Sequence, residues 1–128
     1  MKRDWDLLRN LLINVEEERD LFSGLDDGYE DLEEEQQQKE YAILLGHLEL
    51  LTTNGFIKDV EVLRTVGGFA GMSLDTPYLT MAGHDLLDTI RSATIWESIK
   101  ATAKKKGIEL SFEVVKVLGL AALKHLVG

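Results

Sequence analysis

The sequence predicts an α+β protein, in detail a winged helix-turn-helix with a two-stranded wing and additional carboxy-terminal helices. The first observation is a helical segment that stops at Asn54-Gly55. The second is the alternating series from Phe56 to Val66, followed by a glycine-rich turn and a returning strand from Leu74 to Leu79. The third is a further helical pattern, capped by Thr80. Helix, hairpin and helix in this order are typical of a winged helix.

Two helical segments precede the predicted hairpin. Residues 4–21 form the first, because Asp4 can cap it and its apolar residues repeat at helical spacing: Trp5, Leu8, Leu12 and Val15. Residues 23–29 are rich in glycine and aspartate, which predicts a loop. The sequence leaves open whether residues 31–54 form one helix or two. A helix-turn-helix needs a turn before its recognition helix, so any break is expected between Gln36 and Lys39.

The glycines at positions 67, 68 and 71 mark the tip of the predicted wing. Phe69 and Met72 would lie at this tip, and apolar side chains on an exposed loop are candidate anchors for a partner protein. The alternative is that both side chains simply fold inward.

Three helices are predicted after the wing. The first runs from Met81 to about Arg91, and the second starts at a capping box formed by Thr94–Glu97 and ends at Gly107. Ser111 caps the last helix, Phe112–Val127, which is apolar on nearly every side and therefore needs a cover. That cover is expected to be the first helix or, in a homodimer, the same helix of a second copy, with Leu118 and Leu120 as candidate contacts.

Length and composition bound the protein class. The 128 residues, of which 45% are hydrophobic, suit one domain, with a winged-helix core over residues 1–91 and a helical extension over residues 92–128. There is no signal-peptide pattern and no apolar stretch of the roughly 20 residues that a membrane span needs, so we expect a cytoplasmic protein without membrane attachment. The absence of cysteine excludes disulfides, thiolate catalysis and cysteine zinc sites.

The net charge of −9 is unevenly distributed. Residues 1–90 hold 20 acidic and 7 basic residues, whereas residues 91–128 hold 3 acidic and 7 basic ones. DNA affinity comes largely from lysine and arginine contacts with phosphates, so the acidic part disfavours DNA binding.

A recognition helix in the DNA groove would have to use the polar residues of its exposed faces: Lys39, Glu40, His47, Glu49, Thr52, Thr53 and Asn54. Two glutamates in this set would repel phosphates. As a DNA-binding regulator the protein would instead rely on these candidate contacts: Lys39, Asn54, Lys58, Arg64, Lys104, Lys105 and Lys106. The favoured expectation is a regulatory module that binds a protein partner. A third hypothesis is an acidic mimic of nucleic acid that inhibits a partner.

No pattern of an enzyme or a cofactor site is found. His84 and Asp88 are one helical turn apart, but two ligands without a third do not make a metal site. The acidic loop around Gly28 fails the calcium-loop pattern, and the glycines after Val66 lack the lysine of a phosphate-binding loop. We therefore expect no enzymatic activity, no metal and no cofactor.

Four blocks of the chain together resemble one bacterial and phage family: Met1–Arg9, Gly46–Ile57, Leu79–Arg91 and Thr94–Trp96. They are similar to the domain of unknown function 2513 family. The resemblance implies a winged-helix protein from a bacterial chromosome, prophage or phage, and it supplies no catalytic residues to carry over. The glutamine-rich acidic run Glu30–Glu40 departs from an expectation of DNA binding.

Overall fold

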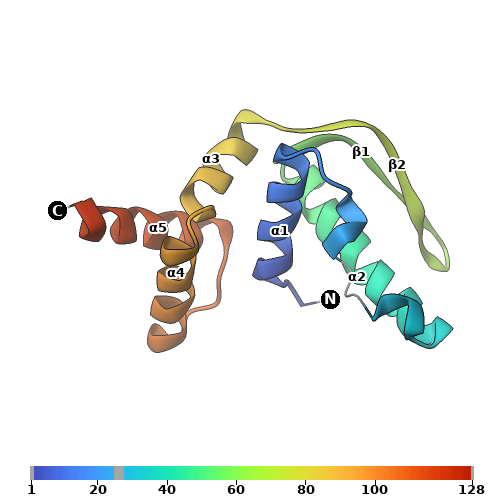
Figure 1. Ribbon diagram of the computed structural model, residues 1–128, viewed down its shortest axis with the longest axis horizontal. Helices are drawn as coiled ribbons and strands as arrows, with labels where there is room; N and C mark the ends of the chain where they lie inside the picture. Colours follow the sequence, from blue (N-terminus) through green and yellow to red (C-terminus); the bar gives the residue numbers. More distant parts are fainter. Residues whose placement is uncertain (1, 25–27, 128) are drawn as a thin grey trace. The chain divides into compact units, whose positions relative to one another are not determined.

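The computed structural model describes residues 2–24 and 28–127, which contain five α-helices, two short 3-10 helices and a two-stranded antiparallel sheet (Figure 1). The α+β class predicted from the sequence is therefore confirmed. The chain divides into two compact units, residues 1–83 and residues 84–128, which we describe in turn. In the described part of the chain, no helix has the length and apolar character needed to cross a membrane.

Helix α1 (Trp5–Glu16) begins where the side chain of Asp4 accepts a hydrogen bond from the backbone N–H of Leu7 at 3.2 Å, which confirms the predicted cap. The prediction that this helix reaches residue 21 is wrong. The backbone of Glu18 turns into the left-handed region, with φ of 55°, and this ends the helix. The apolar stripe of α1 is buried as expected: Trp5, Leu8, Leu11, Leu12 and Val15.

Two 3-10 turns, η1 (Leu21–Gly24) and η2 (Tyr29–Asp31), lead to the long helix α2 (Glu34–Thr53). Helix α2 runs unbroken through residues 36–39, so the question that the sequence left open is answered by one helix. Glutamate, glutamine and lysine are strong helix formers, and no glycine or proline interrupts them. Helices α1 and α2 lie side by side (Figure 1). Four leucines of α2 are completely buried: Leu44, Leu45, Leu48 and Leu51.

The hairpin consists of β1 (Ile57–Thr65) and β2 (Gly68–Leu79). Its register runs from Ile57 opposite Leu79 to Thr65 opposite Gly68. The returning strand was expected to start at residue 74, and this is wrong because the glycine-rich segment already pairs with β1. Phe69 and Met72 consequently lie inside β2 rather than at the tip.

The second unit contains most of α3 (Met81–Ile90) and all of α4 (Ala93–Lys106). The expected capping box at Thr94 is wrong, because the hydroxyl of Ser92 accepts the N–H of Ile95 at 3.3 Å and starts the helix earlier. The end of α4 is as predicted, since Gly107 takes φ of 67° in the left-handed region that favours glycine.

Helix α5 (Phe112–Val127) follows, and the predicted cap is confirmed, since the hydroxyl of Ser111 accepts the N–H of Val114 at 3.1 Å. Within its unit α5 packs against α4. Gly119 of α5 comes so close to Thr89 of α3 that a β-carbon would overlap with its Cγ2 methyl. The expected contact between α5 and the first helix stays a prediction.

Candidate functional site

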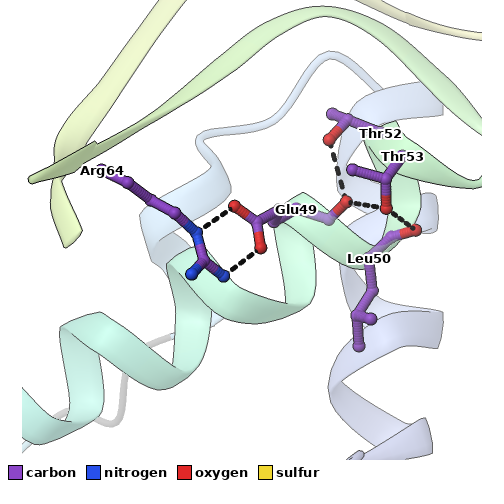
Figure 2. Close-up of polar contacts among 5 residues, drawn as sticks. All are labelled: Glu49, Leu50, Thr52, Thr53 and Arg64. Carbon is purple, nitrogen blue, oxygen red and sulfur yellow. Dashed lines mark hydrogen bonds and ion pairs between the residues drawn. The ribbon is translucent and has the colours of Figure 1, made fainter. Parts of the chain in front are cut away.

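An ion pair joins helix α2 to the hairpin. Arg64 of β1 donates from Nε to Oε2 of Glu49 at 2.7 Å, and its Nη2 donates to Oε1 of the same carboxylate (Figure 2). This two-bond geometry matches the planar guanidinium to the carboxylate. The hydrogen bond from Arg64 lowers the pKa of Glu49, and the same bond raises the pKa of Arg64. Each group therefore holds the other in its charged form.

The polar residues at the end of α2 bond to their own helix. The hydroxyls of Thr52 and Thr53 donate to the carbonyl of Glu49 at 3.0 and 2.8 Å (Figure 2). The side-chain amide of Asn54 donates to the carbonyl of Leu50 at 2.7 Å. The Leu50 carbonyl also accepts the backbone N–H of Asn54 at 3.2 Å, so the side chains share carbonyls at the end of the helix with the backbone. The groups expected to read bases thus serve to terminate the helix.

His47 lies in the core and not on a recognition surface. Its side chain is fully buried, with 0% exposure. Nδ1 donates to the carbonyl of Ile43 at 2.7 Å, and Nε2 accepts the backbone N–H of Asp4 at the same distance. This assigns a neutral imidazole with its proton on Nδ1, because Nε2 faces a donor. His47 is therefore not among the exposed polar residues that α2 could offer to DNA.

The start of α2 carries an exposed acidic surface, formed by Asp31, Glu33, Glu34 and Glu35. Glutamates suit this position because they complement the positive end of the helix dipole. A shallow hollow of about 470 Å³ lies among them and is lined by Asp31, Leu32, Glu33, Glu35, Gln36 and Lys39. Lys39, a predicted phosphate contact, lies 3.9 Å from the carboxylate of Glu35.

The turn η2 is held to α2 by hydrogen bonds between Tyr29 and Gln37, next to this acidic surface. The side-chain amide of Gln37 donates to the carbonyl of Tyr29 at 2.9 Å, and the Tyr29 hydroxyl donates to the carbonyl of Gln37 at 3.3 Å. Phe22 also stacks on Tyr41 of α2, with ring centroids 5.7 Å apart. The acidic surface is therefore part of an ordered scaffold and is not a loose charged segment.

A second concave surface, of about 390 Å³, lies between α4 and α5 in the second unit. Helix α4 contributes three hydroxyl residues at four-residue spacing, Thr94, Ser98 and Thr102, together with Ile95. Helix α5 contributes an apolar wall with one imidazole: Leu118, Ala121, Ala122 and His125.

The candidate protein contacts belong to both units of the chain. Leu118 is half-buried in the α4–α5 groove, whereas Leu120 is 54% exposed. Met72 is half-buried on β2, and the side chain of Phe69 lies outside the described part of the structure.

The candidate nucleic-acid contacts are also scattered. Lys58 is exposed on β1, Arg64 is bound to Glu49, and the exposed lysines 104–106 form the last turn of α4 in the other unit. Sequence reasoning missed Glu49 as the partner of Arg64, because no local pattern links residues 15 positions apart. The four-residue spacing of Thr94, Ser98 and Thr102 could have indicated, from the sequence alone, that these hydroxyl residues share one face of α4.

Metal ligation finds no support in the part of the chain that the structure describes, where no three His, Asp or Glu side chains come together around one point. His84 and Asp88 are both exposed on α3.

Comparison with known proteins gives one family and one relative. The sequence model of a family described as "Hypothetical protein (DUF2513)" matches residues 2–109, and the resemblance found in the sequence is thereby confirmed. A protein of Haemophilus influenzae strain Rd, described as "Uncharacterized protein", is 31% identical over 129 residues, which cover all of both chains. No solved structure matches.

Proposed function

Because the chain belongs to the DUF2513 family of hypothetical proteins, we propose its function from its own surfaces: a non-enzymatic, regulatory module that binds a protein partner, of bacterial, prophage or phage origin. The proposed contact is the acidic surface at the start of α2. The proposed partner carries a complementary basic patch, which such a surface attracts and orients.

The winged-helix architecture is part of the proposal. Its support is the order of α1, α2 and the hairpin formed by β1 and β2 in the first unit. In this interpretation α2 takes the place of the recognition helix and the hairpin that of the wing. The turns η1 and η2 occupy the segment where a winged helix has its supporting helix.

The ion pair between Arg64 and Glu49 is the observation that carries the choice of a protein over DNA. Arg64 is the arginine of the hairpin, and a phosphate would have to compete with a carboxylate that already binds it through two hydrogen bonds. Meanwhile the exposed end of α2 presents carboxylates, which repel phosphates. A basic protein surface meets neither obstacle.

The same ion pair is unsuited to acid–base catalysis. General acid–base catalysis needs a group whose pKa lies near the working pH. The pKa of Glu49 is shifted downward and that of Arg64 upward, so both move away from neutrality. The pair is suited to fixing the hairpin on α2.

The test is site-specific photocrosslinking in the cells that encode the protein. A benzophenone side chain replaces the exposed Gln36, and the control carries it at the exposed Ala101 of α4. We expect an adduct at position 36 that protease removes and nuclease leaves intact. The charge reversals Glu33→Lys, Glu34→Lys and Glu35→Lys together should abolish it. An adduct that nuclease removes, or one that survives the charge reversal, contradicts the proposal.

A DNA-binding transcriptional regulator is the second candidate, and a specific observation favours it. The exposed lysines 104–106 end α4 in the less acidic unit. DNA binding through these lysines is tested by fluorescence anisotropy with random duplex DNA between about 50 and 200 mM salt. Steep loss of affinity with salt, removed by alanine at the three lysines, supports this candidate. No binding at the lowest salt rejects it.

A further inference from the structure

Helix α5 has two faces of different character. The face toward α4 carries the buried Val115 and Gly119 and the half-buried Leu118 and Ala122. The opposite face carries four exposed residues, named here the α5 stripe: Glu113, Val117, Leu120 and Lys124. They are separated by four, three and four positions, and this spacing aligns residues along one side of an α-helix.

The α5 stripe is apolar in its centre and oppositely charged at its two ends. Val117 is 64% exposed and Leu120 is 54% exposed, which is high for adjacent large apolar side chains on one helix face. Glu113 lies in the first turn and Lys124 in the last turn. Among the described residues, neither of these two charges takes part in an ion pair within the chain.

This order of charges is self-complementary when two copies of the stripe run antiparallel. A twofold axis between Leu118 and Gly119 places Glu113 of one copy beside Lys124 of the second copy, and the symmetry repeats this pair at the other end. The same axis brings Val117 of one copy against Leu120 of the second copy. A parallel arrangement would instead place like charges side by side at both ends.

We propose that α5 forms a symmetric antiparallel helix pair with a second copy of this chain, through Val117 and Leu120 at its centre and two Glu113–Lys124 ion pairs at its ends. A closed twofold contact needs one patch that complements itself, and the α5 stripe has this property. Ala121 borders the stripe, and its small side chain allows the two helices to approach closely. This proposal is independent of the acidic surface on α2.

The pair is expected to be weak. A single four-turn helix on each side buries less than the total of about 1,200 Å² that marks a stable standard interface. The dissociation constant should therefore lie in the micromolar range, where the protein exchanges between monomer and dimer.

Sedimentation equilibrium of the whole protein, from about 1 to 200 μM at about 50 mM salt, tests the proposal. Glu113→Lys and Lys124→Glu should each raise the dimer dissociation constant about tenfold, because symmetry converts both ion pairs into repulsions at once. The double variant Glu113→Lys/Lys124→Glu should return the constant to within about twofold of the original. Leu120→Asp should abolish the dimer, because it buries a carboxylate at the centre.

Matched controls separate the stripe from net charge. Glu109→Lys and Lys105→Glu change the net charge by the same amounts at exposed positions outside α5, and they should leave the dissociation constant within about twofold. A protein that stays monomeric at 200 μM overturns the proposal. So does a dimer that is insensitive to the single reversals, or one that the double variant fails to restore.

Discussion

Because α5 closely approaches α3, we predict that one substitution reverses the effect of another on the free energy of unfolding. A β-carbon on Gly119 would overlap with the Cγ2 methyl of Thr89, while it would meet Cδ1 of Ile99 at an ordinary 3.5 Å. Gly119→Ala therefore sets a local gain against a packing loss. Alanine is more favourable than glycine inside a helix by about 1 kcal/mol, and overpacking typically costs about 1–3 kcal/mol.

The packing loss should win in the natural sequence, so Gly119→Ala should lower the free energy of unfolding by about 1 kcal/mol. Thr89→Ser deletes the obstructing methyl. Its hydroxyl can keep the bond that Thr89 makes to the carbonyl of Asp85 at 3.0 Å. Without this methyl group the overlap is removed, and only the higher helix propensity of alanine remains. Gly119→Ala in this background should therefore stabilise the protein by up to about 1 kcal/mol.

Urea denaturation of the four proteins in this cycle, followed by circular dichroism, measures both effects. The coupling energy between the two positions should be about 1–3 kcal/mol. Thr89→Ser alone is the control for loss of the methyl. An equal cost of Gly119→Ala in both backgrounds would show that the overlap with Thr89 does not determine the loss of stability.

Three further predictions concern the first unit. Gly83→Ala should lower the free energy of unfolding by more than Gly119→Ala does, because the added carbon overlaps with the backbone carbonyl oxygen of Phe56, which cannot rotate away; a smaller loss in the same denaturation experiment contradicts this. His47→Phe keeps the buried volume but leaves the amide at the start of α1 without its acceptor, and should cost about 1–3 kcal/mol, with a loss below about 0.5 kcal/mol arguing against it. Since Arg64 lowers the pKa of Glu49 in the folded state, the stability from this pair is present at neutral pH and is lost as the pH falls below the ordinary value of 4.5 through the folded value. Glu49→Gln should therefore show a shallower fall of stability with acid below that pH, and equal slopes for both proteins would refute the assignment.

Local chemistry made several elements predictable from the sequence. The caps at Asp4 and Ser111 and the stop at Gly107 depend on residues within one turn of the helix end, and all three are confirmed. The same is true of the α+β class, because periodicity distinguishes α2 from the hairpin before any tertiary contact is known.

The sequence predictions are least accurate where the winged-helix motif was given more weight than the helix and strand propensities of the residues themselves. A helix-turn-helix template left a break at residues 36–39 open, although glutamine and lysine there favour a continuous helix, and the continuous helix is what forms. The wing tip was drawn too long for a similar reason. The sequence predicts glycines 68 and 71 as loop residues, yet both pair with β1.

The acidic run at the start of α2 was visible in the sequence, whereas the ion pair and the buried histidine were not, because they depend on distant pairs. Glu49 and Arg64 meet only when the hairpin folds back on α2, and a helical wheel alone leaves Glu49 as one more exposed carboxylate. His47 shows the opposite case. Its polar ring suggests a surface position, but the Ile43 carbonyl and the amide of Asp4, 43 residues away, satisfy both ring nitrogens in the core.

These contacts also limit what the first unit can do with nucleic acid. Each phosphate contact contributes about one unit to the slope of log affinity against log salt. Helix α2 and the hairpin together offer Lys39, Lys58 and Arg64 as cations, and carboxylates hold the first and the last of them. A surface with one cation outside these pairs predicts a slope near −1, which is typical of negligible DNA affinity. A steeper slope would originate in cations outside α2 and the hairpin, and alanine at lysines 104–106 tests whether these three supply it.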